Sequence, residues 1–388
     1  MSDIRFSLAA LALGNFVVGL SILAPAGMLE ELARGLVVGV GTTGLLISLG
    51  AGIICVSPPL VAWITSRWDR RTLLGGILLW LAVGHVASGA VGGFASLLGI
   101  RLAVLTIAGA FTPLASGTVA LLTEERDRAS AIAAILLGWA LSIAVGLPLV
   151  SVVAPQIGWR LTYELIGLLA FVSLLALLTG LPRGLKGTPV AFSTWRAVGE
   201  NRKLVLLLLI TGLLGAGQLV IIAFVGPLLT ELAGATPDEI ALVFALFGIM
   251  AIAGNICASR LAGELGAFKT SIFFVGCIAV GVALWAFGVG TYFSMAAGAA
   301  IWGFGFAAAG AMQQVRLIAA APSLATASVS INNTALYLGQ AIGSGISSVL
   351  FSRGHLTAVG FVALALIVAA LALLWLTRTG LESFRPGT

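Results

Sequence analysis

Apolar runs of about 20 residues recur from one end of this 388-residue chain to the other, and short polar breaks separate them. A run of that length crosses a hydrocarbon core of roughly 30 Å as one α-helix, whereas a barrel strand needs only about ten alternating residues. The pattern therefore predicts an all-α membrane protein with twelve transmembrane helices. The predicted spans are residues 6–29, 37–64, 72–92, 95–122, 130–154, 161–181, 204–231, 238–262, 270–288, 291–320, 326–353 and 357–378.

The longest polar break lies between the sixth and seventh spans. We expect residues 182–203 to form a cytoplasmic linker between an N-terminal six-helix half, 1–181, and a C-terminal six-helix half, 204–388. The two halves are weakly similar to each other. At an offset of 197, Gly146 coincides with Gly343, and near the start of each half "LEELARG" matches "LTELAGA" at an offset of 200. Pseudo-symmetric halves are typical of secondary transporters, whose substrate site lies near mid-membrane.

Composition agrees with this class and excludes a soluble globule, because 60% of the residues are hydrophobic and only 9% are charged, against roughly 25% in soluble domains. Most of the Lys and Arg residues fall in breaks that are cytoplasmic if the N-terminus lies inside, which predicts that both termini are cytoplasmic. The net charge of +6 then reflects topology and attraction to membrane lipid, not nucleic acid. Three cysteines, all within spans, give no metal spacing, so we expect no metal and no cofactor.

Charge is concentrated between the second and third spans, where "AWITSRWDRR" occupies residues 62–71. This stretch is similar to the loop pattern G-x-x-x-D-R-x-G-R-[KR] of the major facilitator superfamily, with Ser66 at the acidic position and Asp69 at the glycine position. The fourth span adds Arg101 before a small-residue stretch. The fifth resembles the glycine motif of the drug:proton antiporter family through Gly138, Gly146 and Pro148. The chain thus resembles that family, near the sugar-efflux and arabinose-efflux-like permeases.

The resemblance implies that the charged loop is a conformational latch, whose basic side chains bind carboxylates at neighbouring helix ends when the inner gate is closed. Because Ser66 cannot supply an anion, the loop "TEERDR" at 123–128 is the candidate partner. The alternative is a solvated, lipid-facing loop. The candidate latch residues are Arg67, Asp69, Arg70, Arg71, Glu124 and Asp127.

Polar residues within spans are functional candidates because a charge near mid-bilayer costs about 2.5–3.5 kcal/mol on insertion scales. Arg101 shares a helical face with Thr112, and we expect it to bind a polar or anionic substrate group or a titrating partner; the alternative is a tie to backbone carbonyls or to the first helix. In the eleventh span, Asn333, Tyr337 and Gln340 form a polar stripe, suited either to substrate contact or to interhelical hydrogen bonds.

Further candidates for substrate binding are Asn15, Gln218 and Gln313. Arg316, near the inner end of the tenth span, is expected to snorkel or to gate. Proton antiport needs a group that titrates, and the first span has no carboxylate between Asp3 and Glu30, so His85, with an ordinary pKa of about 6.5, is the coupling candidate.

These features predict a secondary active transporter, and not an enzyme, in the bacterial inner membrane. We expect it to export a small polar or amphiphilic solute, such as a drug, sugar or nucleoside-like molecule, by proton antiport. An uncoupled facilitator or a lipid-type flippase of the same fold is the alternative. The expected partners are the solute, protons and membrane lipid, with no nucleic acid, and the expected state is monomeric.

Overall fold

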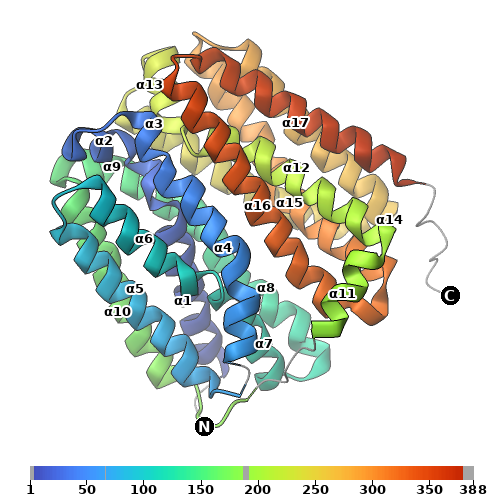
Figure 1. Ribbon diagram of the computed structural model, residues 1–388. Helices are drawn as coiled ribbons and strands as arrows, with labels where there is room; N and C mark the ends of the chain where they lie inside the picture. The colour runs from blue at the N-terminus through green and yellow to red at the C-terminus, as the bar shows by residue number, and fades with distance from the viewer. Residues whose placement is uncertain (1–3, 66, 187–191, 379–388) are drawn as a thin grey trace. The chain divides into compact units, whose positions relative to one another are not determined.

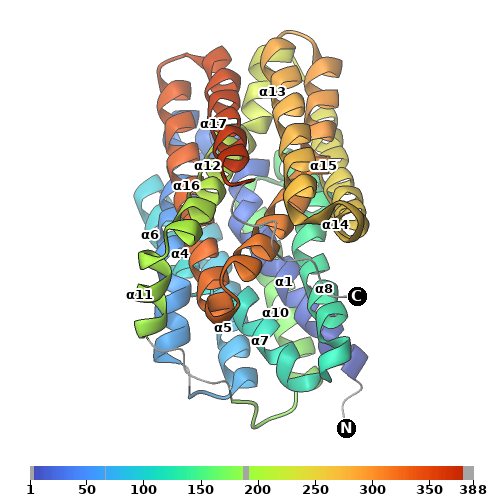
Figure 2. The same cartoon turned by 90° about the vertical axis from the view of Figure 1, so that its right-hand side faces the viewer.

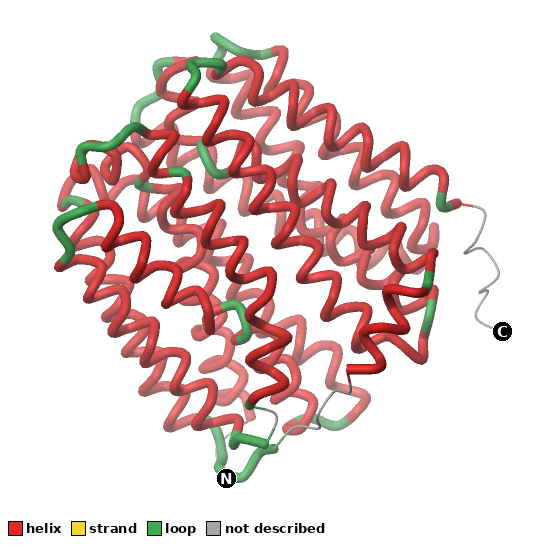
Figure 3. Tube along the Cα trace, viewed as in Figure 1, coloured by secondary structure: helices red, strands yellow, loops and turns green. Residues whose placement is uncertain are grey.

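The computed structural model describes residues 4–65, 67–186 and 192–378, and helices joined by short loops make up almost all of these ranges (Figures 1 and 3). The chain divides into two compact units, Met1–Pro189 and Val190–Thr388. Residues 187–191 of the expected linker lie outside the described ranges, as does Ser66.

Eleven helices in the described ranges are long and apolar enough to cross a membrane. One of them, α14 (Pro237–Phe287), has 51 residues and contains Gly266 with φ 77° and ψ 161°. That conformation is open to glycine and breaks the helix into two spans, which correspond to the predicted spans 238–262 and 270–288. The prediction of twelve spans is therefore confirmed, with a single glycine in place of the expected loop.

In the N-terminal unit α5 packs along α10, and α1 packs against α8 and α10 (Figure 1). Leu20 and Ala24 of α1, and Met28 directly after it, share a buried core with Trp159 and Tyr163 of α10. The elements are α1 Ile4–Gly27, α2 Leu29–Leu36, α3 Val40–Thr43, α4 Leu45–Ile64, α5 Arg70–Ala90, α6 Phe94–Ala108, α7 Phe111–Leu122, α8 Glu125–Leu141, the π-helical turn η1 Ser142–Gly146, α9 Leu147–Ile157 and α10 Trp159–Gly180.

The glycine motif of the fifth span lies on a seam between α8 and α1. A carbon atom added to Gly138 would lie 2.0 Å from the carbonyl oxygen of Ala12, so only glycine allows this approach. Gly146 faces Leu20 of α1 less tightly, at 3.0 Å. The π-helical turn η1 ends two residues before Pro148, whose missing N–H removes one α-helical hydrogen bond at this point.

In the C-terminal unit α15 lies beside α14, and α12 lies beside α16 and α17 (Figure 2). The short helix α11 falls inside the stretch expected to be a linker, where Arg196 pairs with Glu200 at 2.9 Å. The other elements are α11 Phe192–Glu200, α12 Arg202–Ile222, α13 Val225–Ala233, α15 Tyr292–Ala320, the 3-10 turn η2 Pro322–Leu324, α16 Ala325–Ser352 and α17 Leu356–Leu376.

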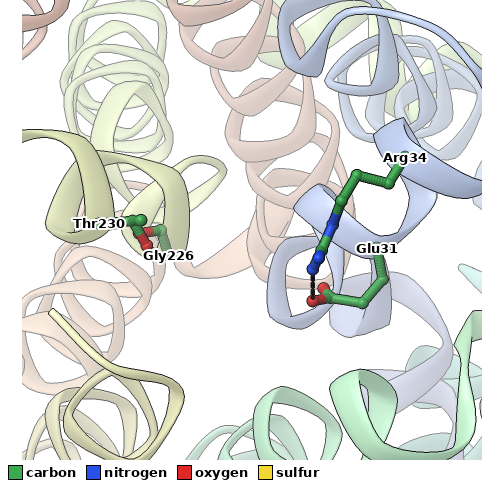
Figure 4. Close-up of polar contacts among 4 residues, drawn as sticks. All are labelled: Glu31, Arg34, Gly226 and Thr230. Carbon is green, nitrogen blue, oxygen red and sulfur yellow. Dashed lines mark hydrogen bonds and ion pairs between the residues drawn. The ribbon is translucent and has the colours of Figure 1, made fainter. Parts of the chain in front are cut away.

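The internal repeat is visible at α2 and α13, the two short helices that carry "LEELARG" and the first five residues of the matching segment. Each follows a backbone break, at Met28 and Phe224, and each ends on a left-handed residue, Val37 (φ 55°) and Gly234 (φ 65°). Local bonds hold both helices: Arg34 pairs with Glu31 at 2.7 Å in α2, and the Thr230 hydroxyl donates to the Gly226 carbonyl at 3.2 Å in α13 (Figure 4).

Candidate transport site

Arg101 of α6 is 4% exposed and donates to three backbone carbonyls. Its Nε donates to Leu46 of α4 at 2.6 Å, and its Nη1 and Nη2 donate to Ser21 and Ile22 of α1 at 3.1 and 2.7 Å. Arg101 therefore joins three helices through main-chain oxygens. This geometry is the carbonyl tie that the sequence left open as an alternative, and a contact with solute stays a prediction.

The position of Pro25 explains why one of these carbonyls needs an external donor. In an α-helix the carbonyl of Ser21 accepts from the N–H of residue 25, and proline has none. An unpaired carbonyl in the apolar interior is costly, and the Arg101 guanidinium supplies the missing donor. The signal was present in the sequence as Pro25 four residues after Ser21, but nothing in the sequence showed that α6 faces it.

His85 of α5 meets the same point of α1. Its Nε2 lies 2.8 Å from Ser21 Oγ, and its ring stacks on Tyr163 of α10 with centroids 5.6 Å apart. The structure therefore brings His85 and Arg101 together around Ser21, and it adds Tyr163, which sequence reasoning did not single out. A role of His85 in proton coupling stays a prediction.

Asn15 and Thr112 form a second buried group in the N-terminal unit. Thr112 Oγ1 donates to Asn15 Oδ1 at 2.6 Å, and Asn15 Nδ2 donates to the carbonyl of Ile135 at 3.0 Å. Arg101 and Thr112 share a face in the sequence, but they have different partners in the structure because they lie about three helical turns apart along one span.

In the C-terminal unit, Gln218 and Gln313 both have partners within the protein. Trp302 Nε1 donates to Gln218 Oε1 at 3.2 Å, and Gln218 Nε2 donates to the carbonyl of Leu214 at 3.0 Å. Gln313 Nε2 donates to the carbonyl of Leu207 at 3.4 Å.

Arg316 is 2% exposed, so the expectation that it snorkels to the membrane surface is wrong. Its guanidinium donates to Gln313 Oε1 at 2.9 Å and to Thr377 Oγ1 at 2.7 Å, and it lies over the ring of Phe268 at 5.5 Å. Packing against α17 and the second half of α14 therefore covers a charge that was expected at the surface.

The stripe on α16 differs from all these groups. Within the described part of the chain the side chains of Asn333, Tyr337 and Gln340 make no hydrogen bond. With about 100° between successive helical residues, the stripe lies nearly opposite a second, apolar face of α16. That apolar face consists of Leu338, Ile342 and Val349, which are 50%, 52% and 50% exposed.

The charged loop contacts the end of α10 and the segment that follows it. One carboxylate oxygen of Asp69 caps α5 through the N–H of Thr72 at 3.1 Å, and the other accepts from the N–H of Gly184 at 2.5 Å. The N–H of Arg70 donates to the carbonyl of Leu185 at 2.8 Å, and the Arg71 guanidinium donates to the carbonyl of Leu178. We call these contacts the Asp69 clasp. Arg67 is exposed, and pairing of the loop with Glu124 or Asp127 stays a prediction.

Burial alone would raise the pKa of the Asp69 carboxyl. The hydrogen bonds that it accepts from the backbone of Thr72, Gly184 and Arg71 and from the Thr72 hydroxyl favour the charged form more strongly, and they lower the pKa below its ordinary value.

Twelve spans in two repeated halves, with polar groups inside the membrane, define a secondary transporter. The family described as Major Facilitator Superfamily matches residues 11–344. The chain is 30% identical over 378 residues to the inner membrane transport protein YdhP of Escherichia coli O157:H7, covering 96% of this chain and 95% of that protein. It is 28% identical over 257 residues to the chloramphenicol resistance protein of Streptomyces lividans, covering 66% and 65%.

A crystal structure of the nucleoside transporter NupG superposes with a TM-score of 0.80 at 13% identity, covering 97% of this chain and 100% of that one. The chain belongs to the Major Facilitator Superfamily. It is a membrane transporter with efflux-type relatives, and the family assignment excludes an enzyme. The resemblance noted in the sequence is confirmed.

Proposed function

We propose that this transporter exports a small, uncharged polar or amphiphilic solute by alternating access, and that Asn333, Tyr337 and Gln340 of α16 contact the solute. One observation carries the proposal. Among the eleven candidate spans of the described residues, α16 has both the lowest mean hydropathy and the smallest buried share. Polar groups without partners are expensive in hydrocarbon, so the stripe faces water or solute. Two amides and a phenol offer hydrogen bonds without net charge.

Export across the inner membrane is supported by the relatives. One is an inner membrane transport protein and another is a chloramphenicol resistance protein. The concentration of Lys and Arg in alternate loops supports cytoplasmic termini.

Proton antiport is the proposed driving reaction, with His85 as the group that gains and loses the proton. Its support is the position of His85 inside the membrane, bonded to Ser21 of α1 and stacked on Tyr163. Histidine is the side chain whose ordinary pKa lies closest to neutral pH.

A second candidate is an uncoupled facilitator or a lipid-type flippase. It is favoured by the composition of α1, which has no carboxylate from Ile4 to Gly27. It is also favoured by the three hydrogen-bond acceptors of Arg101, which are main-chain carbonyls that carry no titratable proton.

Everted membrane vesicles with an acidic interior and an internal pH dye test the proposal. A panel of sugars, nucleosides, phenicols, amphiphilic cations and organic anions is added in turn. We expect an uncharged solute to enter and to release protons. We expect Tyr337→Phe to raise the half-saturation concentration about fivefold, the factor for one neutral hydrogen bond.

Tyr292→Phe is the matched control, because that hydroxyl donates to the carbonyl of Glu239 at the start of α14. Solute entry without proton release, unchanged by His85→Asn, contradicts antiport and favours the facilitator. Preference for organic ions, or a Tyr337→Phe variant that transports like the wild type, contradicts the proposed solute contact.

A further inference from the structure

Thr112, Asn15 and Ile135 join three helices of the N-terminal unit through the hydrogen bonds described above, and we call this group the N-terminal tie. It runs from α7 through α1 to α8. Asn15 is fully buried, with 0% exposure, and both ends of its amide are occupied by the protein. No part of this side chain is left for a solute.

A corresponding group in the C-terminal unit consists of Gln313, Leu207, Thr211 and Asn332, and we call it the C-terminal tie. Thr211 Oγ1 donates to Asn332 Oδ1 at 2.7 Å and lies 3.3 Å from the carbonyl of Leu207. The same carbonyl accepts from Gln313 Nε2 at 3.4 Å. The tie therefore runs from α15 through α12 to α16.

The two ties occupy equivalent places in the repeat. The offset of 197 that aligns Gly146 with Gly343 also places Ile135 on Asn332, and it places Asn15 within one residue of Thr211. The tied spans are the first, fourth and fifth in one half and the seventh, tenth and eleventh in the other. The residue types differ between the halves. What the halves share is a set of hydrogen bonds that joins the same three spans.

Both ties lie on seams where helix backbones touch. Gly138, one turn after Ile135, meets the Ala12 carbonyl of α1, and a carbon atom added to Gly339 would lie 2.0 Å from the Gly212 carbonyl of α12. Close apolar packing keeps water from competing for the hydrogen bonds, so each tie fixes the rotation of one helix against the next.

We propose that the two ties are positioning elements, which keep the three helices of each half in one rigid arrangement while the transporter alternates between its states. Asn332 then sets the rotation of α16 that aims the neighbouring stripe at the pathway. Thr112, Asn15, Thr211 and Asn332 act as positioning residues in place of solute contacts. The part that concerns α16 rests on the proposed function of the stripe.

The test uses two isosteric pairs in the full-length chain: Thr211→Val with Thr211→Ser, and Thr112→Val with Thr112→Ser. Valine keeps the shape and removes the hydroxyl, whereas serine keeps the donor. For the valine variants we expect maximal transport to fall about fivefold, the factor for one neutral hydrogen bond. The half-saturation concentration should stay unchanged in Thr112→Val, and both serine variants should transport at the wild-type rate.

A raised half-saturation concentration at unchanged maximal rate would show direct solute contact and overturn the proposal. Valine variants that transport like the wild type would overturn it as well.

Amide hydrogen exchange separates this proposal from the proposed function, because it needs no solute. We expect Thr211→Val to speed exchange in α12 and α16 and to leave α5 unchanged, with Thr211→Ser matching the wild type. Unchanged exchange in α16 would overturn the tie even if the solute is found. Faster exchange with no solute found would uphold the tie and count only against the proposed function.

Discussion

At the scale of single residues, buried polar side chains in this transporter bind the backbone more than they bind one another. Arg101 contacts three carbonyls, Asn15 contacts one, and Gln218 and Gln313 contact one each. Main-chain oxygens are the acceptors that a helical membrane protein always offers, and a side chain that binds one also fixes the position of its helix.

Arg101 donates to the Ser21 carbonyl, which lacks a helical donor because of Pro25. This arrangement predicts that a second substitution restores stability lost with Arg101. Arg101→Met leaves the Ser21 carbonyl without a donor, and we expect the free energy of unfolding to fall by about 1–3 kcal/mol. Adding Pro25→Ala restores an N–H four residues after Ser21 and should recover about 1 kcal/mol of that loss. Thermal unfolding in detergent measures both changes. A double variant no more stable than Arg101→Met would contradict the assigned role of Pro25.

The sequence could identify these residues but not their partners. Arg101, His85 and Asn15 stand out as polar groups within apolar spans. A hydropathy pattern defines the faces of each helix, but it does not say which helices are neighbours. Asn332 and Asn333 show the limit most clearly, because adjacent residues of one type point about 100° apart, one into the C-terminal tie and one into the stripe.

At the scale of elements, the positions of the spans could be predicted from the sequence because each span needs a long apolar run. The sequence did not predict the short helices α2, α11 and α13. Eight or nine residues give too little periodicity, and local capping decides where such helices end. The same limit applies to the Asp69 clasp. The concentration of charged residues marked the loop between the second and third spans as a functional candidate. It did not show that this loop binds the start of the linker.

The clasp predicts a pH dependence in the acid range. A depressed pKa means that the stabilising contribution of Asp69 is present above its ordinary value, near 3.9, and is lost as the pH falls through the lower folded value. A nitroxide label at Lys186→Cys should therefore be restricted at pH 6 and should become mobile only when the pH falls below the ordinary carboxyl value, near 3.9.

Asp69→Ala is the control for this experiment, and the label should be mobile in it at every pH. A label in the native background that is mobile at pH 6, or that becomes mobile already above about pH 4, would contradict the clasp, as would a label that is unaffected by Asp69→Ala.

At the scale of the whole molecule, the transporter consists of two repeated six-helix halves with a polar tie inside each half. Among the described residues, the side chains of the stripe on α16 make no hydrogen bond. The resemblance to the superfamily was recognisable from the charged loop and the span count. The sequence did not show that α16 carries three different faces: Asn332 in the C-terminal tie, the apolar face, and the stripe. These faces depend on the contacts of α16 with α12.

Cysteine accessibility along α16 shows whether its polar stripe lines a water-filled solute pathway. In a chain whose three native cysteines are replaced, Asn333→Cys, Tyr337→Cys and Gln340→Cys are compared with Leu338→Cys and Ile342→Cys on the apolar face. We predict that a membrane-impermeant thiol reagent labels the first three and leaves the other two unlabelled, and that transported solute protects the labelled positions. Equal labelling of both faces, or an unreactive stripe, would contradict a solute pathway along α16.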